Sequence, residues 1–227
     1  MSTPLAGIRA CVFDAYGTLF DVASATRHAA ADLGDAAAPL ATLWRDKQLQ
    51  YSWLRAVQGR HADFWQVTGD ALDFALDAMG LAEPDRRRRL MQLYLTPDAY
   101  PEVPETLHRL RIAGLATAIL SNGTPDMLAA AVAHAGLTGM LDQVLSVEEV
   151  GVYKPHPRVY QLALDRLGFG AAEIAFVSSN GWDAWAAAAF GMRAVWCNRQ
   201  DQPRERLPGA PAAEICSLAD LPPLLGA

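Results

Sequence analysis

The spacing of hydrophobic residues changes along the chain, from a single strand to helices and then to strands that alternate with helices. Residues 11–13 form a continuous apolar run, which predicts a buried strand that ends at Asp14. From about residue 23 to 94, apolar residues recur only at helical spacings, and no strand pattern interrupts them. This change of pattern predicts a helical segment inserted directly after the first strand.

After residue 96 the pattern alternates between apolar runs and segments with helical periodicity. Strands are expected at 115–120, 144–146, 174–177 and 194–197, and helices at 104–114, 125–135, 158–167 and 182–190. Continuous apolar strands separated by helices are typical of a parallel sheet covered on both faces. We therefore expect an α/β fold with a doubly wound parallel sheet in residues 1–20 and 97–227, and a helical cap domain in residues 21–96.

Polar residues follow several of the predicted strands. Asp14, Ser121 and Ser178 each come directly after the last apolar residue of a strand, and Lys154 lies in the loop after a fourth strand. The carboxyl ends of strands in an open α/β sheet share one edge, where ligands bind. A buried carboxylate at this edge that neighbours hold ionised is a poorly hydrated nucleophile. We expect a site here with the helical segment as its lid, although each residue alone could be an ordinary turn residue.

Composition limits the possible partners. The chain has 227 residues, a net charge of −6 and three cysteines that form no CxxC motif. A net negative charge is not typical of proteins that bind nucleic acid or anionic membranes. No apolar stretch is long enough to span a bilayer, and the first residues do not have the layout of a signal peptide. We therefore expect a cytoplasmic protein with a small-molecule substrate, and neither nucleic acid nor a membrane as partner.

Five motifs together resemble the haloacid dehalogenase superfamily, and more narrowly its L-2-haloacid dehalogenases. They are DAYGTLFDV from Asp14, LWRDKQLQY from Leu43, LSNG from Leu120, VYKP from Val152 and SSNGWD from Ser178. The resemblance implies hydrolysis of L-2-haloacids to D-2-hydroxyacids and halide, through an ester formed on Asp14. It also implies that no metal or other cofactor is used, and that the protein is a homodimer.

The resemblance assigns roles to individual residues. Asp14 is the nucleophile, Arg45 receives the halide, Lys154 holds Asp14 ionised, and Asp183 is the base for water, positioned by Asn180 and Ser178. The catalytic residues that it implies are Asp14, Thr18, Arg45, Ser121, Lys154, Tyr160, Ser178, Asn180 and Asp183. The substrate-binding residues that it implies are Ala15, Tyr16, Leu49, Phe64, Asn122 and Trp182.

Two other functions are compatible with parts of this pattern. Phosphatases share much of the first motif, but they need Mg²⁺ and a second Asp two residues after the nucleophile, where this chain has Tyr16. A catalytically idle relative acting as a binding protein is the other alternative, although the charged residues of all the motifs are present. No Walker motif, complete GxGxxG motif or GxSxG elbow points to a different chemistry.

Some of these residues also have a purely structural interpretation. Arg45 could be an ordinary surface residue of a helix, and Tyr160 an ordinary core residue. The aromatic and Leu positions could likewise belong only to the core. Asp46 stands where these dehalogenases commonly have Gln, so an acidic group there could draw Arg45 away from the halide or set its angle.

Overall fold

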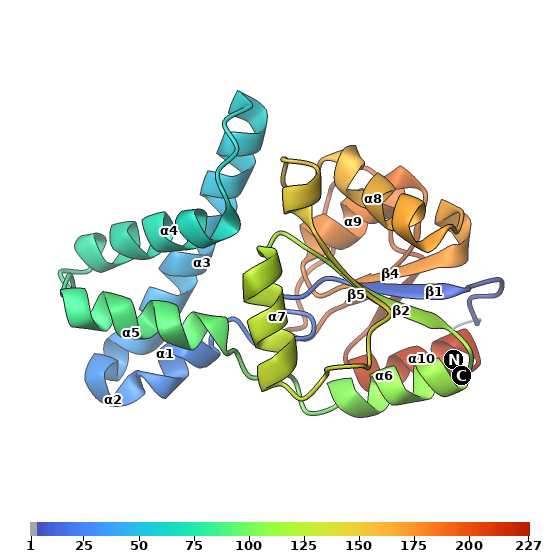
Figure 1. Cartoon of the computed structure of the whole chain (residues 1–227), viewed down its shortest axis with the longest axis horizontal. Helices are drawn as coiled ribbons and strands as arrows, with labels where there is room; N and C mark the ends of the chain where they lie inside the picture. Colours follow the sequence, from blue (N-terminus) through green and yellow to red (C-terminus); the bar gives the residue numbers. More distant parts are fainter. Residues whose placement is uncertain (1–3) are drawn as a thin grey trace.

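The computed structural model describes residues 4–227, and a six-stranded parallel sheet forms its centre (Figure 1). The strands are β1 (Ala10–Phe13), β2 (Ala116–Ser121), β3 (Gln143–Ser146), β4 (Ile174–Ser178), β5 (Arg193–Cys197) and β6 (Ala213–Ile215). Their order in the sheet is β3-β2-β1-β4-β5-β6. The first five strands lie where the sequence predicts them, whereas β6 is too short and too polar to form an apolar run of its own.

The order of the strands places β1 at the point where the direction of the connections reverses. The chain passes from β1 to β2 and β3 on one side, and then returns to β4 and β5 on the other. Both neighbours of β1 are parallel to it, so their carboxyl ends meet at the same edge as the end of β1. Ligands in α/β folds bind at such a switch point, and Asp14 directly follows β1 there.

Helices cover both faces of the sheet, as the sequence predicts. They are α6 (Val103–Ile112), α7 (Pro125–His134), α8 (Pro157–Leu167), α9 (Gly181–Phe190) and α10 (Leu221–Leu225). Figure 1 shows α8 and α9 above the sheet and α6 and α10 below it. α9 packs on β4 and β5, α6 packs on β2, and α7 packs on β3. The fold is therefore a doubly wound α/β fold.

Five further helices lie between β1 and α6 and form a layer beside the sheet (Figure 1). They are α1 (Ser24–His28), α2 (Ala30–Leu33), α3 (Ala37–Gln58), α4 (Phe64–Ala78) and α5 (Pro84–Leu95). Gly59 ends α3 in the left-handed conformation, and the Asp63 side chain caps α4 by accepting from the Gln66 N–H. None of the helices within residues 4–227 combines the length and apolarity that crossing a lipid bilayer requires.

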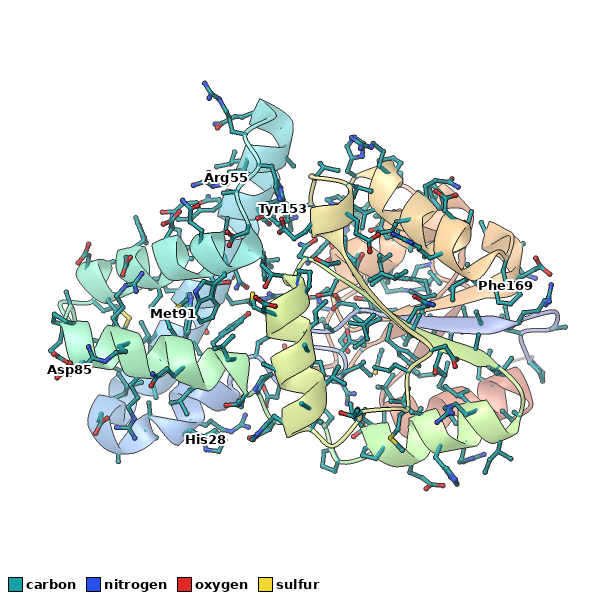
Figure 2. All side chains as sticks on the ribbon, viewed as in Figure 1. His28, Arg55, Asp85, Met91, Tyr153 and Phe169 are labelled. Atoms are coloured by element: carbon teal, nitrogen blue, oxygen red, sulfur yellow. The ribbon has the colours of Figure 1, made fainter. Side chains whose placement is uncertain are left out.

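The start of α4 is fastened to the loop that carries Lys154. Tyr153 donates a hydrogen bond to the carbonyl of Ala62, and its ring lies 5.8 Å from that of Phe64. Glu148 accepts from the Phe64 N–H at 3.3 Å, and its other oxygen lies 2.9 Å from His61 Nε2. Figure 2 shows Tyr153 at this boundary between the helical layer and the sheet. These contacts hold the helical layer over the edge of the sheet where Asp14 lies.

Candidate active site

Asp14 has both carboxylate oxygens held by side chains from other parts of the fold. Lys154 Nζ donates to Oδ1 at 3.1 Å, while Thr18 Oγ1 and Asn180 Nδ2 donate to Oδ2 at 3.1 and 2.7 Å. The backbone N–H of Asp14 donates to the carbonyl of Val177 on the neighbouring strand at 2.9 Å. The carboxylate is thus buried at the end of a strand, where one charged donor and two neutral donors hold it in place.

Lys154 lies between two carboxylates. Its side chain is 1% exposed, and Nζ donates to Asp14 Oδ1 at 3.1 Å and to Asp183 Oδ2 at 2.8 Å. Burial on its own would lower the pKa of Lys154, but the charges and hydrogen bonds of Asp14 and Asp183 raise it overall. The backbone N–H of Lys154 donates to Asn122 Oδ1 at 3.0 Å, which fixes the loop. Lys154 therefore stays protonated and links the two acids.

Asp183 is fully buried in the first turn of α9. Tyr160 Oη donates to its Oδ1 at 2.7 Å, and Lys154 donates to its Oδ2. Burial raises the pKa of Asp183 above its usual value of 3.8, and the charge of Lys154 offsets only part of that rise. Burial also raises the pKa of Tyr160 far above its usual range, so its hydroxyl remains a donor.

Asn180 and Ser178 are expected to position Asp183, but its carboxylate is held by Lys154 and Tyr160. Asn180 holds Asp183 only through the backbone, where its carbonyl accepts from the Asp183 N–H at 3.0 Å. Asn180 is the N-cap residue of α9 with an extended backbone, and its side chain reaches Asp14 rather than Asp183. Ser178 Oγ accepts from the Asn180 N–H at 3.1 Å and so fixes the loop. The Tyr160 ring makes an edge-to-face contact with that of Phe176 at 5.6 Å, so Tyr160 is both a core residue and a partner of Asp183.

Arg45 reaches this site from α3. Its Nη1 donates to Gln48 Oε1 at 2.7 Å, and its Nη2 donates to the Tyr16 carbonyl at 3.4 Å and to Asn180 Oδ1 at 3.3 Å. These three acceptors are all uncharged, and Arg45 forms no ion pair within residues 4–227. The interpretation of Arg45 as an ordinary surface residue is therefore wrong.

Asp46 does not hold Arg45. It is exposed to solvent, and neighbouring residues of a helix do not face each other. Gln48, three residues after Arg45 and on the same face of α3, is the residue that contacts the guanidinium.

Asn180 joins the two halves of the site. Its Nδ2 donates to Asp14 and to the Tyr16 carbonyl at 3.2 Å, and its Oδ1 accepts from Arg45. The loop from Asp14 to Thr18 fits against this amide because Gly17 has a φ of +94°, which favours glycine. A single amide therefore connects the carboxylate of the sheet edge with the guanidinium of the helical layer.

The ends of β1 and β2 supply further polar groups. Ser121 is buried, and its Oγ accepts from the Gly123 N–H at 3.1 Å. The carbonyl of Ala15 accepts N–H groups of the tight turn that follows it. A side chain at Gly123 would bring its Cβ within 2.9 Å of the Tyr16 ring, so glycine allows the ring to lie against this backbone.

Aromatic residues surround the loop after Asp14 on the helical side. The Tyr16 ring lies 6.4 Å from that of Phe64 and 5.5 Å from that of Tyr94. Burial raises the pKa of Tyr16 far above its usual range, so its hydroxyl is neutral. The structure thus brings Tyr16 and Phe64 together as an apolar wall.

The other two residues predicted for this wall, Leu49 and Trp182, lie on α3 and α9. Trp182 makes an edge-to-face contact with Trp53 of α3 at 5.4 Å, and both line an apolar cavity of about 790 Å³ that Tyr160 also borders. Leu49 is half-buried on α3, one turn after Arg45. The contacts therefore connect Trp182 with the boundary between α3 and α9.

A buried polar cluster behind Arg45 is not predicted by the sequence motifs. Gln48 Nε2 donates to Thr68 Oγ1 at 2.7 Å and to Tyr94 Oη at 3.0 Å. Its members come from α3, α4 and α5, so their proximity depends on how these helices pack. The available signal is the spacing of three residues between Arg45 and Gln48, which puts them on one helix face.

Within residues 4–227, no cluster of three or more His, Cys, Asp or Glu side chains has an arrangement suited to a metal ion. The positive charge between Asp14 and Asp183 comes instead from Lys154. The arrangement as a whole offers a supported carboxylate, a buried acid with a raised pKa, and a guanidinium with neutral partners.

Sequence relatives align with this chain over nearly their whole length. Residues 8–191 match the model of the haloacid dehalogenase-like hydrolase family. The chain is 51% identical over 219 residues to (S)-2-haloacid dehalogenase 1 of Pseudomonas sp. (strain CBS-3), an alignment that covers 96% of each protein. It is 47% identical to (S)-2-haloacid dehalogenase 4A of Burkholderia cepacia, over 96% of this chain and 95% of the relative.

Solved structures agree with these relatives. The L-2-haloacid dehalogenase of Xanthobacter autotrophicus with covalently bound chloropropionic acid is 40% identical and has a TM-score of 0.91, over 97% of this chain and 99% of the other. A dehalogenase crystal structure that is 46% identical has a TM-score of 0.96, over 98% of this chain and 99% of the other. As its motifs predict, the chain therefore belongs to the haloacid dehalogenase-like hydrolases and, within them, to the (S)-2-haloacid dehalogenases.

Proposed function

We propose that the protein converts L-2-haloacids to D-2-hydroxyacids and halide through an ester on Asp14, without a metal ion. The chain is a hydrolase that acts on carbon–halide bonds, as the names of relatives at 40–51% identity over most of its length indicate. A relative whose structure is described with covalently bound chloropropionic acid supports a small 2-halocarboxylic acid as the substrate.

In the first step, a carboxylate oxygen of Asp14 attacks C2 of the substrate from the side opposite the halogen. A C–O bond forms, the carbon–halogen bond breaks, and its electron pair leaves with the halide. The configuration at C2 therefore inverts once. Ser121 and the backbone N–H groups near Ala15, Tyr16 and Asn122 are the proposed donors to the substrate carboxylate.

The observation that carries this proposal is the environment of Arg45. A halide leaves as a stable anion and needs no proton, but its developing negative charge needs stabilisation. Arg45 has only neutral acceptors, and Asn180 connects it to Asp14. Its charge is therefore free to receive an anion close to the nucleophile.

In the second step, water attacks the carbonyl carbon of the Asp14 ester and transfers a proton to Asp183. The tetrahedral intermediate then breaks the bond to the substrate oxygen, which takes the proton from Asp183 and leaves as the hydroxyacid; the other proton of the water passes to solvent, which restores the Asp14 carboxylate. Lys154 stabilises the negative charge on the ester oxygen, since its ammonium lies 3.1 Å from Asp14 Oδ1. The raised pKa of Asp183 suits a general base, because a base is most effective when its pKa approaches the working pH.

The remaining predicted residues have supporting roles in this proposal. Thr18, Tyr160 and Ser178 hold Asp14, Asp183 and the Asn180 loop, respectively. Tyr16 and Phe64, extended by Leu49 and Trp182, form the apolar wall that excludes water from the first step. Residues 21–96 act as a cap domain over a core domain of residues 1–20 and 97–227.

A halide-release assay tests the function directly. Both enantiomers of 2-chloropropionate and 2-bromopropionate are supplied to chelator-treated protein, and p-nitrophenyl phosphate with added Mg²⁺ serves as the comparison substrate. The proposal expects halide release from the (S) enantiomers alone and undiminished activity in chelator. Loss of halide release in chelator would overturn the proposed metal-independent reaction. Phosphate release without halide release would support the phosphatase alternative and overturn the proposal.

A further inference from the structure

We propose that Gln48 is a positioning residue for halide expulsion, which orients Arg45 while leaving its positive charge uncompensated. This inference rests on the proposed function, because it concerns the guanidinium that receives the halide. Gln48 itself is 1% exposed and lies behind Arg45, on the side of the helical layer. It therefore acts through Arg45 and not by contact with substrate.

Gln48 makes the shortest of the hydrogen bonds that hold Arg45. The distance from Nη1 to Gln48 Oε1 is 2.7 Å, whereas Nη2 lies 3.3 and 3.4 Å from its two acceptors in the sheet-edge loops. Because the guanidinium is planar, a short hydrogen bond at one nitrogen also fixes the direction in which the N–H groups of the other nitrogen point. Gln48 thus determines where the free donors of Arg45 point.

The Gln48 amide is itself held in one orientation. Its Nε2 donates to Thr68 Oγ1 at 2.7 Å and to Tyr94 Oη at 3.0 Å, so its carbonyl oxygen must face Arg45. Thr68 Oγ1 in turn donates to the carbonyl of Phe64 at 2.6 Å. Turning the amide over would place its NH₂ group against the guanidinium and its carbonyl oxygen against Thr68 Oγ1, whose proton is already donated to the Phe64 carbonyl. The Tyr94 hydroxyl, which also lies 3.2 Å from Gln48 Oε1, is compatible with either orientation.

The cluster also connects Arg45 to the nucleophile loop. Tyr94 stacks on Tyr16 with 5.5 Å between ring centroids and packs on Trp44 at 5.1 Å. Trp44 Nε1 donates to the Thr68 carbonyl at 2.9 Å. The position of Arg45 relative to the loop after Asp14 is therefore set by packed rings and not only by the long bonds from Nη2.

Charge explains why an amide suits this position better than a carboxylate. Gln48 is neutral, and burial raises the pKa of Tyr94, so its hydroxyl is neutral as well. A Glu in place of Gln48 would keep the shape and the short hydrogen bond, but it would form a buried ion pair with Arg45. The paired guanidinium would then stabilise a departing anion less.

The test compares Gln48→Glu and Gln48→Met with Ser52→Ala as a matched control. Ser52 is buried one turn further along α3, and its hydroxyl donates only to the Leu49 carbonyl, at 2.8 Å. Single-turnover halide release is measured with (S)-2-chloropropionate and (S)-2-bromopropionate. Decay of the ester on Asp14 is followed by rapid quench and mass spectrometry, and circular dichroism reports folding.

We expect Gln48→Glu to slow chloride release by about 100-fold, which is the rate loss typical of a misplaced catalytic group. Bromide release should slow by less. Bromide is the better leaving group, so it depends less on Arg45. Gln48→Met loses the hydrogen bond without adding charge, so its effect on chloride release is expected at about 10-fold. Decay of the preformed ester changes by no more than about twofold in either variant, because Arg45 has no part in that step.

A purely structural role would slow both leaving groups and both steps equally, and that result would overturn the inference. Chloride release at the wild-type rate in folded Gln48→Glu would overturn it as well. If Gln48→Glu does not fold, an unchanged bromide-to-chloride ratio in Gln48→Met decides against it. Wild-type protein that releases no halide would instead disprove the proposed function, and Ser52→Ala should match the wild type throughout.

Discussion

The two buried or half-buried cations of the site have opposite electrostatic surroundings. Lys154, on a loop at the edge of the sheet, donates to the carboxylates of Asp14 and Asp183. Arg45, on a helix of the neighbouring layer, donates only to an amide oxygen of Gln48, an amide oxygen of Asn180 and a backbone carbonyl. The sheet therefore surrounds its cation with negative charge, and the helical layer does not.

This difference indicates what each cation can do. Two carboxylates and one ammonium leave the cluster around Lys154 with a net negative charge, so that cluster does not attract a second anion. Lys154 is suited to keep Asp14 ionised and to stabilise charge on its own ester. Arg45 is suited to receive an anion from elsewhere, since no carboxylate offsets its charge. The predictions below test this division, from the largest expected effect to the smallest.

Replacement of Asp14 by Asn removes the nucleophile from the negatively charged cluster. We expect Asp14→Asn to lower turnover of (S)-2-chloropropionate by about 10⁴-fold or more, because no other carboxylate has Asp14's position at the end of β1. Halide release measured by ion chromatography checks this.

Isotopic labelling separates this role from direct attack by water. A single turnover of wild-type protein in H₂¹⁸O should leave the heavy oxygen on Asp14, because water attacks the ester carbonyl there. Mass spectrometry of the peptide that contains Asp14 measures the label. Heavy oxygen in the hydroxyacid on that first turnover would contradict the ester, as would substantial activity in Asp14→Asn.

Replacement of Asp183 by Asn keeps the nucleophile and removes the base. We expect Asp183→Asn to lower steady-state turnover by about 10³-fold, while the first step still proceeds. A burst of about one halide per protein molecule should precede the slow phase, and the ester should accumulate on Asp14. Stopped-flow halide detection and intact-mass analysis measure both. A variant that loses the burst would place Asp183 in the first step instead.

Replacement of Arg45 by Lys tests the cation of the helical layer. A lysine ammonium cannot reproduce the planar contacts to Gln48 and Asn180, so we expect single-turnover chloride release to slow by about 100-fold. Ester decay should be unaffected. Arg55→Lys is the matched control, since Arg55 lies on the same helix and pairs with Asp70 at 3.1 Å. Equal slowing of ester decay would show that Arg45 also acts after the halide has left.

The two cations also differ in how far their surroundings could be predicted from the sequence. The nucleophile and Lys154 lie beside buried apolar strands, and parallel strands bring their carboxyl ends to one edge whatever the details of packing. Their approach to each other therefore follows from periodicity and strand order. The strand β6 is an exception, because its three residues have little apolar character.

The surroundings of Arg45 depend on the packing of helices, which periodicity does not determine. Gln48, Thr68 and Tyr94 meet only because α3, α4 and α5 pack together, and their spacing along the chain does not indicate these contacts. The motifs also do not indicate which side chains contact the Asp183 carboxylate, because its direction depends on the position of Asp183 in the first turn of α9. Motifs thus identify the groups of a site better than the contacts between them.

The smallest effect is expected from Tyr160→Phe, which tests the environment of Asp183. Burial raises the pKa of Asp183, and the hydrogen bond from Tyr160 opposes that rise, so removing the hydroxyl should raise the pKa further. Since the base acts as a carboxylate, the acidic limb of ester decay should move to higher pH, with a rate loss of about 10-fold or less above it. Lys154 does not titrate in this range, because its pKa is raised above 10.5. Quench-flow ester decay measured against pH checks the shift, and a limb that stays in place or moves to lower pH would exclude Asp183 as the titrating base.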